Sequence, residues 1–467
     1  MESPGIPSTV TTVDLQRMEP IAAGVNRRYI WLFTCVAALG GLLFGFDTAV
    51  ISGAIPYISA YFSLDEYLLG WAVGAILIGC AAGSLLAGGA ADRYGRRLVL
   101  VVCALLFAAS GIGAGLSEQL HWFVFFRLLG GLGVGAAALV SPMYIAEMAP
   151  ARLRGRLVAF YQMAIASGIL LAYCSNLLLD HTGENNWRWM FASQAVPSVL
   201  FLAFLLVVPE TPRWLIRRGR QQEAKTVLEK IHGEAPLEAE MEAIQKSYQQ
   251  ASHSSVKELF SMKYRAVLWL GILIAVFQQI TGINAIIYYA PVIFRQTGIS
   301  GSSSLMQTIG VGIVTVLATL FAIGFVDRLG RKMFFLIGSL TMTVSLMAVG
   351  ACFQLSYFDH YIVLAFTLLY VASFGCTLGA VTWVYLSEIF PNRVRGLAMS
   401  VATLALWLAD FIVTYTFPVM ARQLGTAATM YCYAGICLIA CWYMFTRVKE
   451  TKGKSLEEIE TLFFPSK

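Results

Sequence analysis

Twelve long apolar stretches run through this sequence and leave few folds open to it. Each is at least about as long as the roughly 20 residues that a helix needs to cross the hydrocarbon core of a bilayer. Hydrophobic residues make up 58% of the 467 residues and charged residues only 13%, against about 25% in soluble domains. The sequence therefore predicts an all-α membrane protein with twelve transmembrane helices. The predicted spans are 29–58, 66–91, 98–117, 122–146, 155–179, 188–208, 266–294, 305–326, 333–354, 361–386, 396–421 and 426–446.

The basic residues between these spans predict the orientation of the chain. Lys and Arg gather in alternate polar segments, and the positive-inside rule places such segments in the cytoplasm. Both termini are then expected in the cytoplasm, and the net charge of +6 reports topology rather than a nucleic-acid partner. The basic segments are the amino-terminal tail, 93–97, 152–156, 213–265, 328–332, 393–395 and the residues from 447 onward.

The order of the spans also predicts how the chain is divided. Residues 1–28 lack the apolar core and cleavage site of a signal peptide, so a cytoplasmic tail is expected there. In the long polar interval, Ala224, Val227, Leu228 and Ile231 have helical spacing, which predicts short amphipathic helices on the cytoplasmic face. The predicted divisions are a tail (1–28), an amino-terminal six-helix half (29–209), a cytoplasmic helical linker (210–263), a carboxyl-terminal six-helix half (264–447) and a second tail (448–467).

Short motifs recur in the same order in both halves of the sequence. A duplication in parallel orientation places both sets of motifs on the same side of the membrane. Two pseudo-symmetric halves with a site between them at mid-membrane are typical of a rocking transporter. Residues 92–97 return as 327–332, residues 147–155 as 388–396, and residues 209–213 as 450–452.

The charged residues of these motifs form the first candidate site. Charged groups confined to one membrane face in both halves can tie the halves together while a central site is open to the outside. The alternative is that these groups only anchor helix ends among the lipid headgroups. The candidate gate residues are Asp92, Arg93, Arg96, Glu147, Arg154, Glu210, Asp327, Arg328, Arg331, Glu388 and Arg395.

Asp47 is the second candidate, because it lies in a glycine-rich apolar run where a charge is costly. Such an acid usually faces protein or water and is used, so the simplest role for Asp47 is to bind and release a proton. Arg127 is the only charge in the fourth apolar stretch and is the expected partner. A movement that separates the two would favour protonation of Asp47. The alternative is an ion pair that only fixes helix packing.

The third candidate site is a set of primary amides. Amides offer both donors and acceptors, which suits the hydroxyl groups of an uncharged sugar. Gly282 can unwind the seventh span between them, and a tryptophan offers a ring face for the apolar side of a pyranose. The alternative is structural amides that bond across helices. These residues are Gln278, Gln279 and Asn284 in the seventh span, Gln162 in the fifth and Trp383 in the tenth.

Four motifs together resemble those of the sugar porters of the major facilitator superfamily, and the match covers the whole chain apart from the amino-terminal tail. The chain looks most similar to bacterial xylose- and glucose-type proton symporters. The resemblance implies the major facilitator fold and import of a monosaccharide, hexose or pentose, coupled to protons by alternating access. The motifs are the paired Asp-Arg-x-Gly-Arg-Arg/Lys loops, Pro-Glu-Thr-Pro-Arg-Trp-Leu at 209–215, Gln-Gln-x-x-Gly-Ile-Asn at 278–284 and Glu-Thr-Lys-Gly at 450–453.

The resemblance also assigns roles to individual residues. The family's proton symporters carry aspartate where its uncoupled facilitators carry asparagine, so Asp47 and Arg127 are expected to couple proton movement. It further implies a monomer in the inner membrane of a bacterium, with no cofactor and no enzymatic activity. The positions that match sugar contacts are Phe44, Gln162, Gln278, Gln279, Asn284, Tyr288 and Trp383.

Four positions depart from the family pattern and leave the identity of the sugar open. Ala380 replaces the proline of a motif in the tenth span, so a weaker kink is expected there. Leu406 and Thr315 stand where amides are common, and Ile169 stands where the xylose symporter has glutamine. The pocket in the carboxyl-terminal half is therefore expected to be less polar than usual.

Asp410 is a further departure, because family members often have asparagine at this position. It is the only charge between Arg395 and Arg422, and it lies three residues from Trp407 on the same helix face. One hypothesis makes Asp410 a second protonatable group. Another makes it a hydrogen-bond acceptor that offsets the missing amide at Leu406. The alternative is a structural acid held neutral by a backbone or hydroxyl partner.

Other classes of protein match the sequence less well. The nine cysteines all lie in apolar segments without paired-ligand spacing, so neither a disulfide framework nor a metal site is expected. The five histidines are scattered in loops, and no Ser/His constellation indicates an enzyme. An uncoupled sugar facilitator and a non-transporting sugar sensor are the remaining alternatives.

Overall fold

The computed structural model of the chain describes residues 26–150, 153–232, 237–238, 241–242, 244–245, 256–356, 360–391, 393–454 and 456–463. Twelve helical stretches within these residues are long and apolar enough to cross a membrane, and none of the residues described forms a β-strand. The predicted all-α fold with twelve spans is therefore confirmed. The predicted segment limits lie within a few residues of the helix ends.

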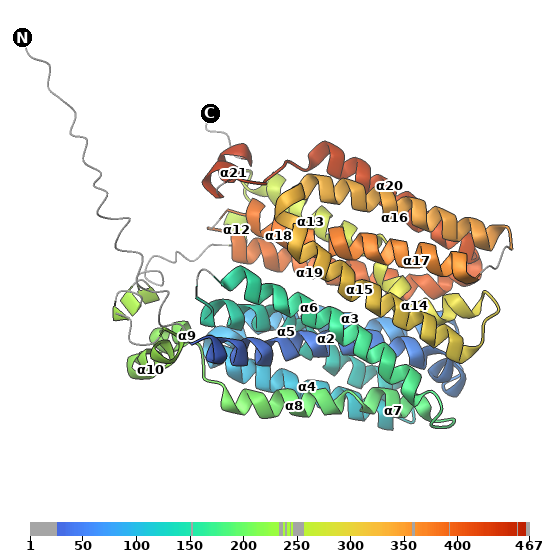
Figure 1. Cartoon of the computed structure of the whole chain (residues 1–467), viewed down its shortest axis with the longest axis horizontal. Coiled ribbons are helices and arrows are strands. Elements are labelled where there is room, and N and C mark those ends of the chain that lie inside the picture. The colour runs from blue at the N-terminus through green and yellow to red at the C-terminus, as the bar shows by residue number, and fades with distance from the viewer. Residues whose placement is uncertain are drawn as a thin grey trace, which may run out of the picture.

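Two groups of six spans lie side by side along the molecule, the first blue to green and the second yellow to red (Figure 1). The first group contains α2 (Arg27–Tyr61), α3 (Glu66–Tyr94), α4 (Arg96–Leu116), α5 (Leu120–Met148), α6 (Arg154–Leu179), α7 (Asn186–Ala192) and α8 (Ala195–Val207). The second contains α13 (Arg265–Ile280), α14 (Ile283–Arg295), α15 (Gly301–Leu329), α16 (Arg331–Gln354), α17 (His360–Phe374), the π-helical turn η1 (Gly375–Gly379), α18 (Ala380–Ile389), α19 (Arg395–Gln423) and α20 (Thr426–Arg447). Three spans are interrupted, at α7/α8, α13/α14 and α17/η1/α18.

The internal repeat is visible in the backbone as well as in the sequence. Gly95 ends α3 and precedes α4, and Gly330 ends α15 and precedes α16. Their φ angles are +101° and +91°, which side chains with a Cβ rarely adopt. Glycine at these two places therefore permits the same tight turn in both halves.

Short helices lie together at one end of the bundle, which we call the linker end (Figure 1). They are α9 (Pro212–Arg217), α10 (Gln221–His232) and α12 (Val256–Leu259) of the linker, and α21 (Leu456–Phe463) after the last span. Ala224, Val227, Leu228 and Ile231 are buried, as the amphipathic pattern predicted. The backbone N–H of Asn26 donates to the carbonyl of Ile231 (3.1 Å), so α10 packs near the start of α2. Sequence reasoning missed α21, and the predicted first tail lies almost wholly outside the described residues.

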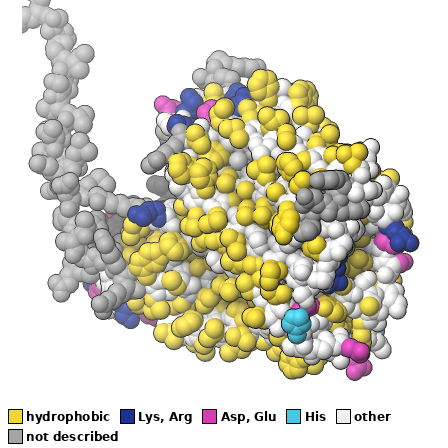
Figure 2. Space-filling model, turned by 45° about the vertical axis from the view of Figure 1, so that its right-hand side comes forward, with side chains coloured by type: hydrophobic (Ala, Val, Ile, Leu, Met, Phe, Trp, Pro, Cys, Tyr) yellow, Lys and Arg dark blue, Asp and Glu magenta, His cyan; other side chains and the backbone are white. Residues whose placement is uncertain are grey.

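Glycines allow the closest helix contacts in the amino-terminal half. A Cβ on Gly45 of α2 would collide with the backbone carbonyl of Ile165 on α6, and one on Gly168 with that of Leu42. Small residues of this kind let membrane helices approach closely. On the surface of the bundle, hydrophobic side chains spread over the face seen in Figure 2, and charged side chains lie mainly toward its margins. Such a surface suits a lipid environment.

Candidate functional site

A buried ion pair joins α2 and α5 inside the amino-terminal half. Nη1 of Arg127 donates to Oδ1 of Asp47, and neither side chain is exposed. The guanidinium also lies over the ring of Phe191, 5.4 Å from its centroid. A Cβ on Gly130 would stand 2.8 Å from Oδ2 of Asp47, so a larger residue there would force the carboxylate to shift. The predicted partnership is therefore formed in this conformation, in a tightly packed place.

The seventh span is broken where the sequence predicted unwinding. α13 ends at Ile280 and α14 begins at Ile283, and Gly282 between them has a φ of +95°. The break separates Gln278 and Gln279 on one helix from Asn284 on the next. These three amides consequently approach one another at the ends of two short helices, instead of following one helix face.

A chain of hydrogen bonds links these amides to the eleventh span. Nε2 of Gln279 donates to Oε1 of Gln278 (3.5 Å), and Nδ2 of Asn284 donates to Oε1 of Gln279 (3.0 Å). Nδ2 of Asn284 also donates to Oδ2 of Asp410 on α19 (2.7 Å). Oδ1 of Asp410 accepts from the hydroxyl of Thr414, one turn further on (3.3 Å). Asp410 therefore belongs to the same polar cluster as the predicted sugar-binding amides.

The tenth span is irregular although it lacks the family's proline. Residues Gly375–Gly379 form a π-helical turn directly before Ala380, and such turns locally disrupt the helical hydrogen-bond ladder. Nε2 of Gln278 donates to the carbonyls of Leu378 and Gly379, both at 3.3 Å. The weaker kink expected at Ala380 stays a prediction, and a π turn interrupts the span directly before this residue.

Of the remaining predicted contacts, Phe44 lies where the two halves meet. The ring of Phe44 on α2 lies 5.8 Å from that of Trp407 on α19, measured between centroids. Tyr288 is buried, and its electrostatic neighbours include Asp410 of its own half and Asp47 and Arg127 of the other. Gln162 on α6 and Trp383 on α18 are each half-buried, and in the described structure no hydrogen bond joins either to the amide chain.

Sequence reasoning did not include Trp407 among the sugar contacts. Its indole N–H is buried and has no hydrogen-bond partner among the described residues. An indole can only donate, so this group requires an acceptor that the fold does not supply. The available signal was its position, next to Leu406 and three residues before Asp410.

At the positions that depart from the family pattern, the side chains are apolar or hydrogen-bonded within their own helix. The hydroxyl of Thr315 donates to the carbonyl of Val311 one turn back (2.8 Å). Leu406 is buried, and Ile169 is buried against α2 near Gly45. None of these three residues carries an amide. Asp410 is therefore the polar group that the carboxyl-terminal half has in addition to its predicted amides.

Equivalent charge networks occupy the linker end of each half. In the first, Oε1 of Glu147 accepts from Nη2 of Arg96 (3.0 Å), and Oε2 accepts from the hydroxyl of Thr211 (2.6 Å). Glu210 accepts the backbone N–H groups of Arg96 and Arg97, both at 3.0 Å, at the start of α4. A carboxylate at a helix N-terminus is stabilised by these donors. Burial nevertheless raises the pKa of Glu210 above its ordinary value.

The second half repeats this arrangement. Oε1 of Glu388 accepts from Nη2 of Arg331 (2.8 Å), and Oε2 accepts from the hydroxyl of Thr451 (2.6 Å). Glu450 accepts the backbone N–H groups of Arg331 (2.9 Å) and Lys332 (3.0 Å) at the start of α16. Partial burial opposes ionisation of Glu450, but hydrogen bonds from four backbone N–H groups outweigh it and hold its pKa below the ordinary value.

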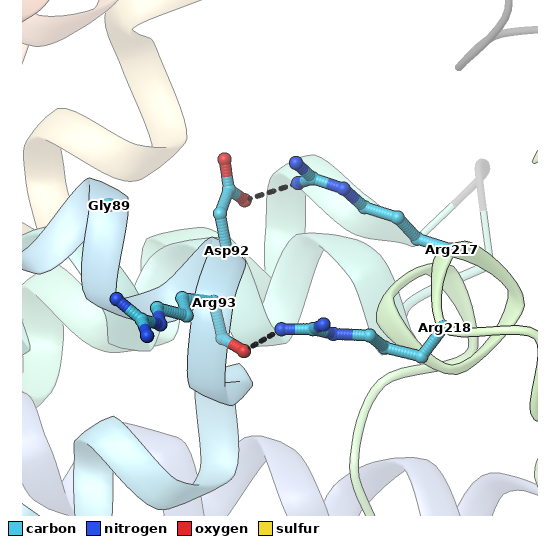
Figure 3. A pocket seen from close by; sticks show the side chains of 5 residues that line it. All are labelled: Gly89, Asp92, Arg93, Arg217 and Arg218. Atoms are coloured by element: carbon cyan, nitrogen blue, oxygen red, sulfur yellow. Dashed lines mark hydrogen bonds and ion pairs between the residues drawn. The ribbon is translucent and has the colours of Figure 1, made fainter.

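A pocket of about 310 Å³ opens between α3 and the linker (Figure 3). Oδ1 of Asp92 pairs with Arg96 (3.2 Å) and with Arg217 (3.1 Å), and Arg218 donates to the carbonyl of Arg93. These bonds hold the linker against the amino-terminal half. The pocket is lined by Gly89, Asp92, Arg93, Arg217 and Arg218.

The other predicted gate residues are less involved in this conformation. Arg154 is exposed at the start of α6, and Nε of Arg395 donates to the carbonyl of Phe390 (3.0 Å). The side chains of Asp327 and Arg328 lie outside the described part. The gate contacts given above thus lie within one half, between a half and the linker, or between a half and the segment after the last span. Contact between the two halves was expected in the outward-open conformation, so that role stays a prediction.

Polar contacts do join the halves at the opposite end. Asp180, after α6, accepts from the hydroxyl of Tyr57 (2.5 Å) and from that of Ser302 at the start of α15 (3.1 Å). Arg422 at the end of α19 pairs with Glu66 at the start of α3 (3.4 Å). We call these contacts the opposite-end latch. The structure is therefore held together across its halves at the end away from the linker.

The fold and this site define a polytopic membrane carrier with two repeated halves and a polar centre between them. The sequence profile described as "Sugar (and other) transporter" matches residues 33–463. The chain therefore belongs to the sugar transporter family of the major facilitator superfamily, which is a family of transporters and not of enzymes.

Three similar curated proteins are bacterial. It is 40% identical to the D-xylose-proton symporter of Escherichia coli K12, over 94% of this chain and 97% of that protein. It is 38% identical to the arabinose-proton symporter of Bacillus subtilis (97% and 99% covered) and to the glucose transport protein of a Synechocystis species (94% and 99% covered). The chain is thus a multi-pass membrane protein related to bacterial sugar transporters.

Solved structures of the E. coli xylose transporter XylE are similar throughout. The inward open conformation has a TM-score of 0.83 at 39% identity and covers 93% of this chain and 99% of that one. The proton:xylose symporter bound to 6-bromo-6-deoxy-D-glucose has a TM-score of 0.79 at 39% identity, with 94% and 100% covered. The match to the major facilitator fold therefore extends over more than nine-tenths of the chain.

Proposed function

We propose that this chain imports a monosaccharide, a hexose or a pentose, together with protons by alternating access in a bacterial inner membrane. The observation that carries the proposal is the juxtaposition of two buried polar centres. One is the Asp47–Arg127 pair inside the amino-terminal half. The other is the amide chain of the carboxyl-terminal half, which faces the first across the interface at Tyr288.

The amide chain is suited to an uncharged polyol. The side chains of Gln279 and Asn284 are hydrogen-bonded to one another in this conformation. Sugar hydroxyls can replace that hydrogen bond without leaving either amide unpaired. The Trp407 N–H needs an acceptor, which a ring oxygen or hydroxyl provides. Phe44 and Trp383 add ring faces for the apolar side of the sugar. We assign sugar binding to Phe44, Gln162, Gln278, Gln279, Asn284, Tyr288 and Trp383, with Trp407 added.

Asp47 is proposed to carry the coupled proton. In the conformation described, its carboxylate is paired with Arg127, as expected after proton release. Protonation from the outside removes the charge on Asp47 and weakens its attraction to Arg127. The freed guanidinium then favours a different packing of α5 against α2. Sugar binding and closure follow, and inward opening restores the pair and releases the proton.

The charge networks are proposed to act as the cytoplasmic gate, with the linker end and both termini facing the cytoplasm. Each network bonds within its half in this conformation, while the opposite-end latch joins the halves. This distribution, together with the similarity to the inward open xylose transporter, supports an inward-facing arrangement. In the outward-open conformation, the two networks are proposed to meet and close the linker end.

Counterflow of labelled sugars in proteoliposomes tests the proposal. Preloaded D-xylose, arabinose or D-glucose should drive transient uptake of its labelled form, and an imposed inward proton gradient should drive accumulation above equilibrium. Counterflow without accumulation would identify an uncoupled facilitator. Binding without counterflow would identify a sensor, and would refute transport of these three sugars.

A further inference from the structure

Asp410 occupies the middle of a membrane helix without a cation beside it. Its side chain is 1% exposed, and its two oxygens accept hydrogen bonds from Asn284 and Thr414, which are both uncharged. No ion pair involving Asp410 is found among the described residues. Asp47 differs in this respect, because Arg127 compensates its charge. Among the residues that the structure describes, Asp47 and Asp410 are thus the two fully buried carboxyl groups, and only Asp47 has a counter-charge.

The groups that face Asp410 from neighbouring helices do not supply a charge. Cys80 of α3 and Tyr288 of α14 are its electrostatic neighbours, and Tyr289 of α14 donates its hydroxyl to the carbonyl of Thr414. From α20, Tyr433 stacks on Phe417 of α19. At this level, α13 presents the amides of the hydrogen-bonded chain. Thiol and phenol groups are uncharged at neutral pH, so they do not compensate a carboxylate.

Among the described residues, the charged groups of this helix packing lie toward its two ends, and Arg422 of α19 pairs with Glu66 of α3 at one of them. Helices α12, α13 and α18 carry Glu258, Arg265 and Glu388 near their ends, where they approach the start of α19 at Arg395. Fifteen residues of helix separate Arg395 from Asp410, or about 22 Å at 1.5 Å per residue. A desolvated carboxylate so placed favours its neutral, protonated form for part of the transport cycle.

We propose that Asp410 is a second proton-binding group, which couples a proton to sugar binding through its hydrogen bond with Asn284. The proposal rests on the proposed function, since it assumes that the amide chain binds sugar. When Asp410 is ionised, it is a strong acceptor and holds the amide of Asn284. A proton taken from the water on the uptake side forms the Oδ1–H bond, which then donates to the hydroxyl oxygen of Thr414. The neutral carbonyl Oδ2 is a weaker acceptor, so Asn284 is released toward a sugar hydroxyl.

Release on the other side reverses these steps. When the sugar leaves, the amide of Asn284 returns to Asp410 and again favours the carboxylate, and the proton passes to water. No bond other than O–H is made or broken. Tyr288 and Cys80 each interact electrostatically with both carboxyl groups. The carrier would therefore move two protons with each sugar.

The stoichiometry in proteoliposomes tests this inference. The reversal potential of D-xylose, arabinose or D-glucose flux, whichever shows accumulation, should correspond to two protons per sugar in the wild type and to one in Asp410→Asn. Glu118→Gln, the same chemical change at an exposed loop position, should retain two. One proton per sugar in both the wild type and Asp410→Asn would overturn the inference while leaving symport through Asp47 intact.

A second measurement does not require Asp410→Asn to fold. Proton uptake on addition of the same sugar is followed with a pH dye, in weakly buffered solutions of purified wild type and Asp47→Asn. Asp47→Asn should still take up protons, because Asp410 remains. Uptake by the wild type and none by Asp47→Asn would overturn the role of Asp410. No uptake by the wild type and no gradient-driven accumulation would instead refute proton coupling as a whole.

Discussion

Asp47→Asn tests the coupling role of the buried ion pair most directly. The amide keeps the shape of the carboxyl group and removes its charge, as protonation does. Breaking a buried pair by removing one charge costs about 3–5 kcal/mol, because the other charge stays buried and uncompensated. Both partners are fully buried here. We expect the lower end of this range, since the amide oxygen still accepts from the guanidinium of Arg127.

This cost falls on the conformation in which the pair is formed. A loss of about 3 kcal/mol changes the conformational equilibrium constant by roughly two orders of magnitude. The change favours conformations in which Asp47 and Arg127 are apart. Asp47→Asn should therefore lose the proton that Asp47 carries, and its accumulation under a proton gradient should fall to what Asp410 alone can drive. It should retain counterflow, because exchange requires no net proton movement.

Both quantities are measured in the same proteoliposomes, with Asp65→Asn as the matched control. Asp65 accepts from the backbone N–H of Leu68 (2.7 Å) as the N-cap of α3, and asparagine caps helices equally well. The control should behave as the wild type. Accumulation by Asp47→Asn equal to that of the wild type would refute the coupling role of Asp47.

Three further predictions concern the pocket, the opposite-end latch and the linker end. Gln162→Ala and Gln279→Ala should each weaken sugar binding by about 1–3 kcal/mol, or roughly 5- to 150-fold in Kd; unchanged binding in both places the sugar elsewhere. Asp180→Asn should weaken the latch by about 1.5–3 kcal/mol, the range for hydrogen bonds to a charged group, and raise the population open at that end in spin-label distance measurements; an unchanged distribution contradicts the latch. The pKa of Glu450 is lowered, so its carboxylate adds stability above the ordinary glutamate pKa that is lost as pH falls through the lowered value. The pKa of Glu210 is raised, so its ionised form adds no stability. Glu450→Gln should therefore lower Tm at pH 7, whereas Glu210→Gln should not. An equal decrease in Tm for both variants would contradict this difference.

The sequence allowed prediction of what depends on chain length, period and isolated charges. The twelve spans follow from apolar runs long enough to cross a bilayer. The pairing of Asp47 with Arg127 follows because each is alone in its apolar stretch. The break at Gly282 follows because glycine alone tolerates its positive φ angle easily.

Features that depend on contacts between helices could not be predicted in the same way. The bond between Asn284 and Asp410 requires the register of α14 against α19, which no local pattern encodes. The π turn before Ala380 has no sequence signal, because one extra residue in a turn leaves the apolar composition unchanged. Likewise, the hydroxyls of Thr211 and Thr451 engage Glu147 and Glu388, although charge alone suggested only arginine partners.

The repeated networks explain why sugar and protons are expected to act at the interface between the halves. In each half, a glutamate at the linker end accepts hydrogen bonds from an arginine and a threonine in the same geometry. These bonds stabilise the packing of each half at that end. A half stabilised in this way moves as a rigid body, so the contacts that change are those between the halves. Asp47 lies inside one half, paired with Arg127, whereas Asp410 accepts a hydrogen bond from Asn284, an amide that we propose binds the sugar. The two acids would therefore sense different events: Asp47 the packing of its own half, and Asp410 the occupancy of the site.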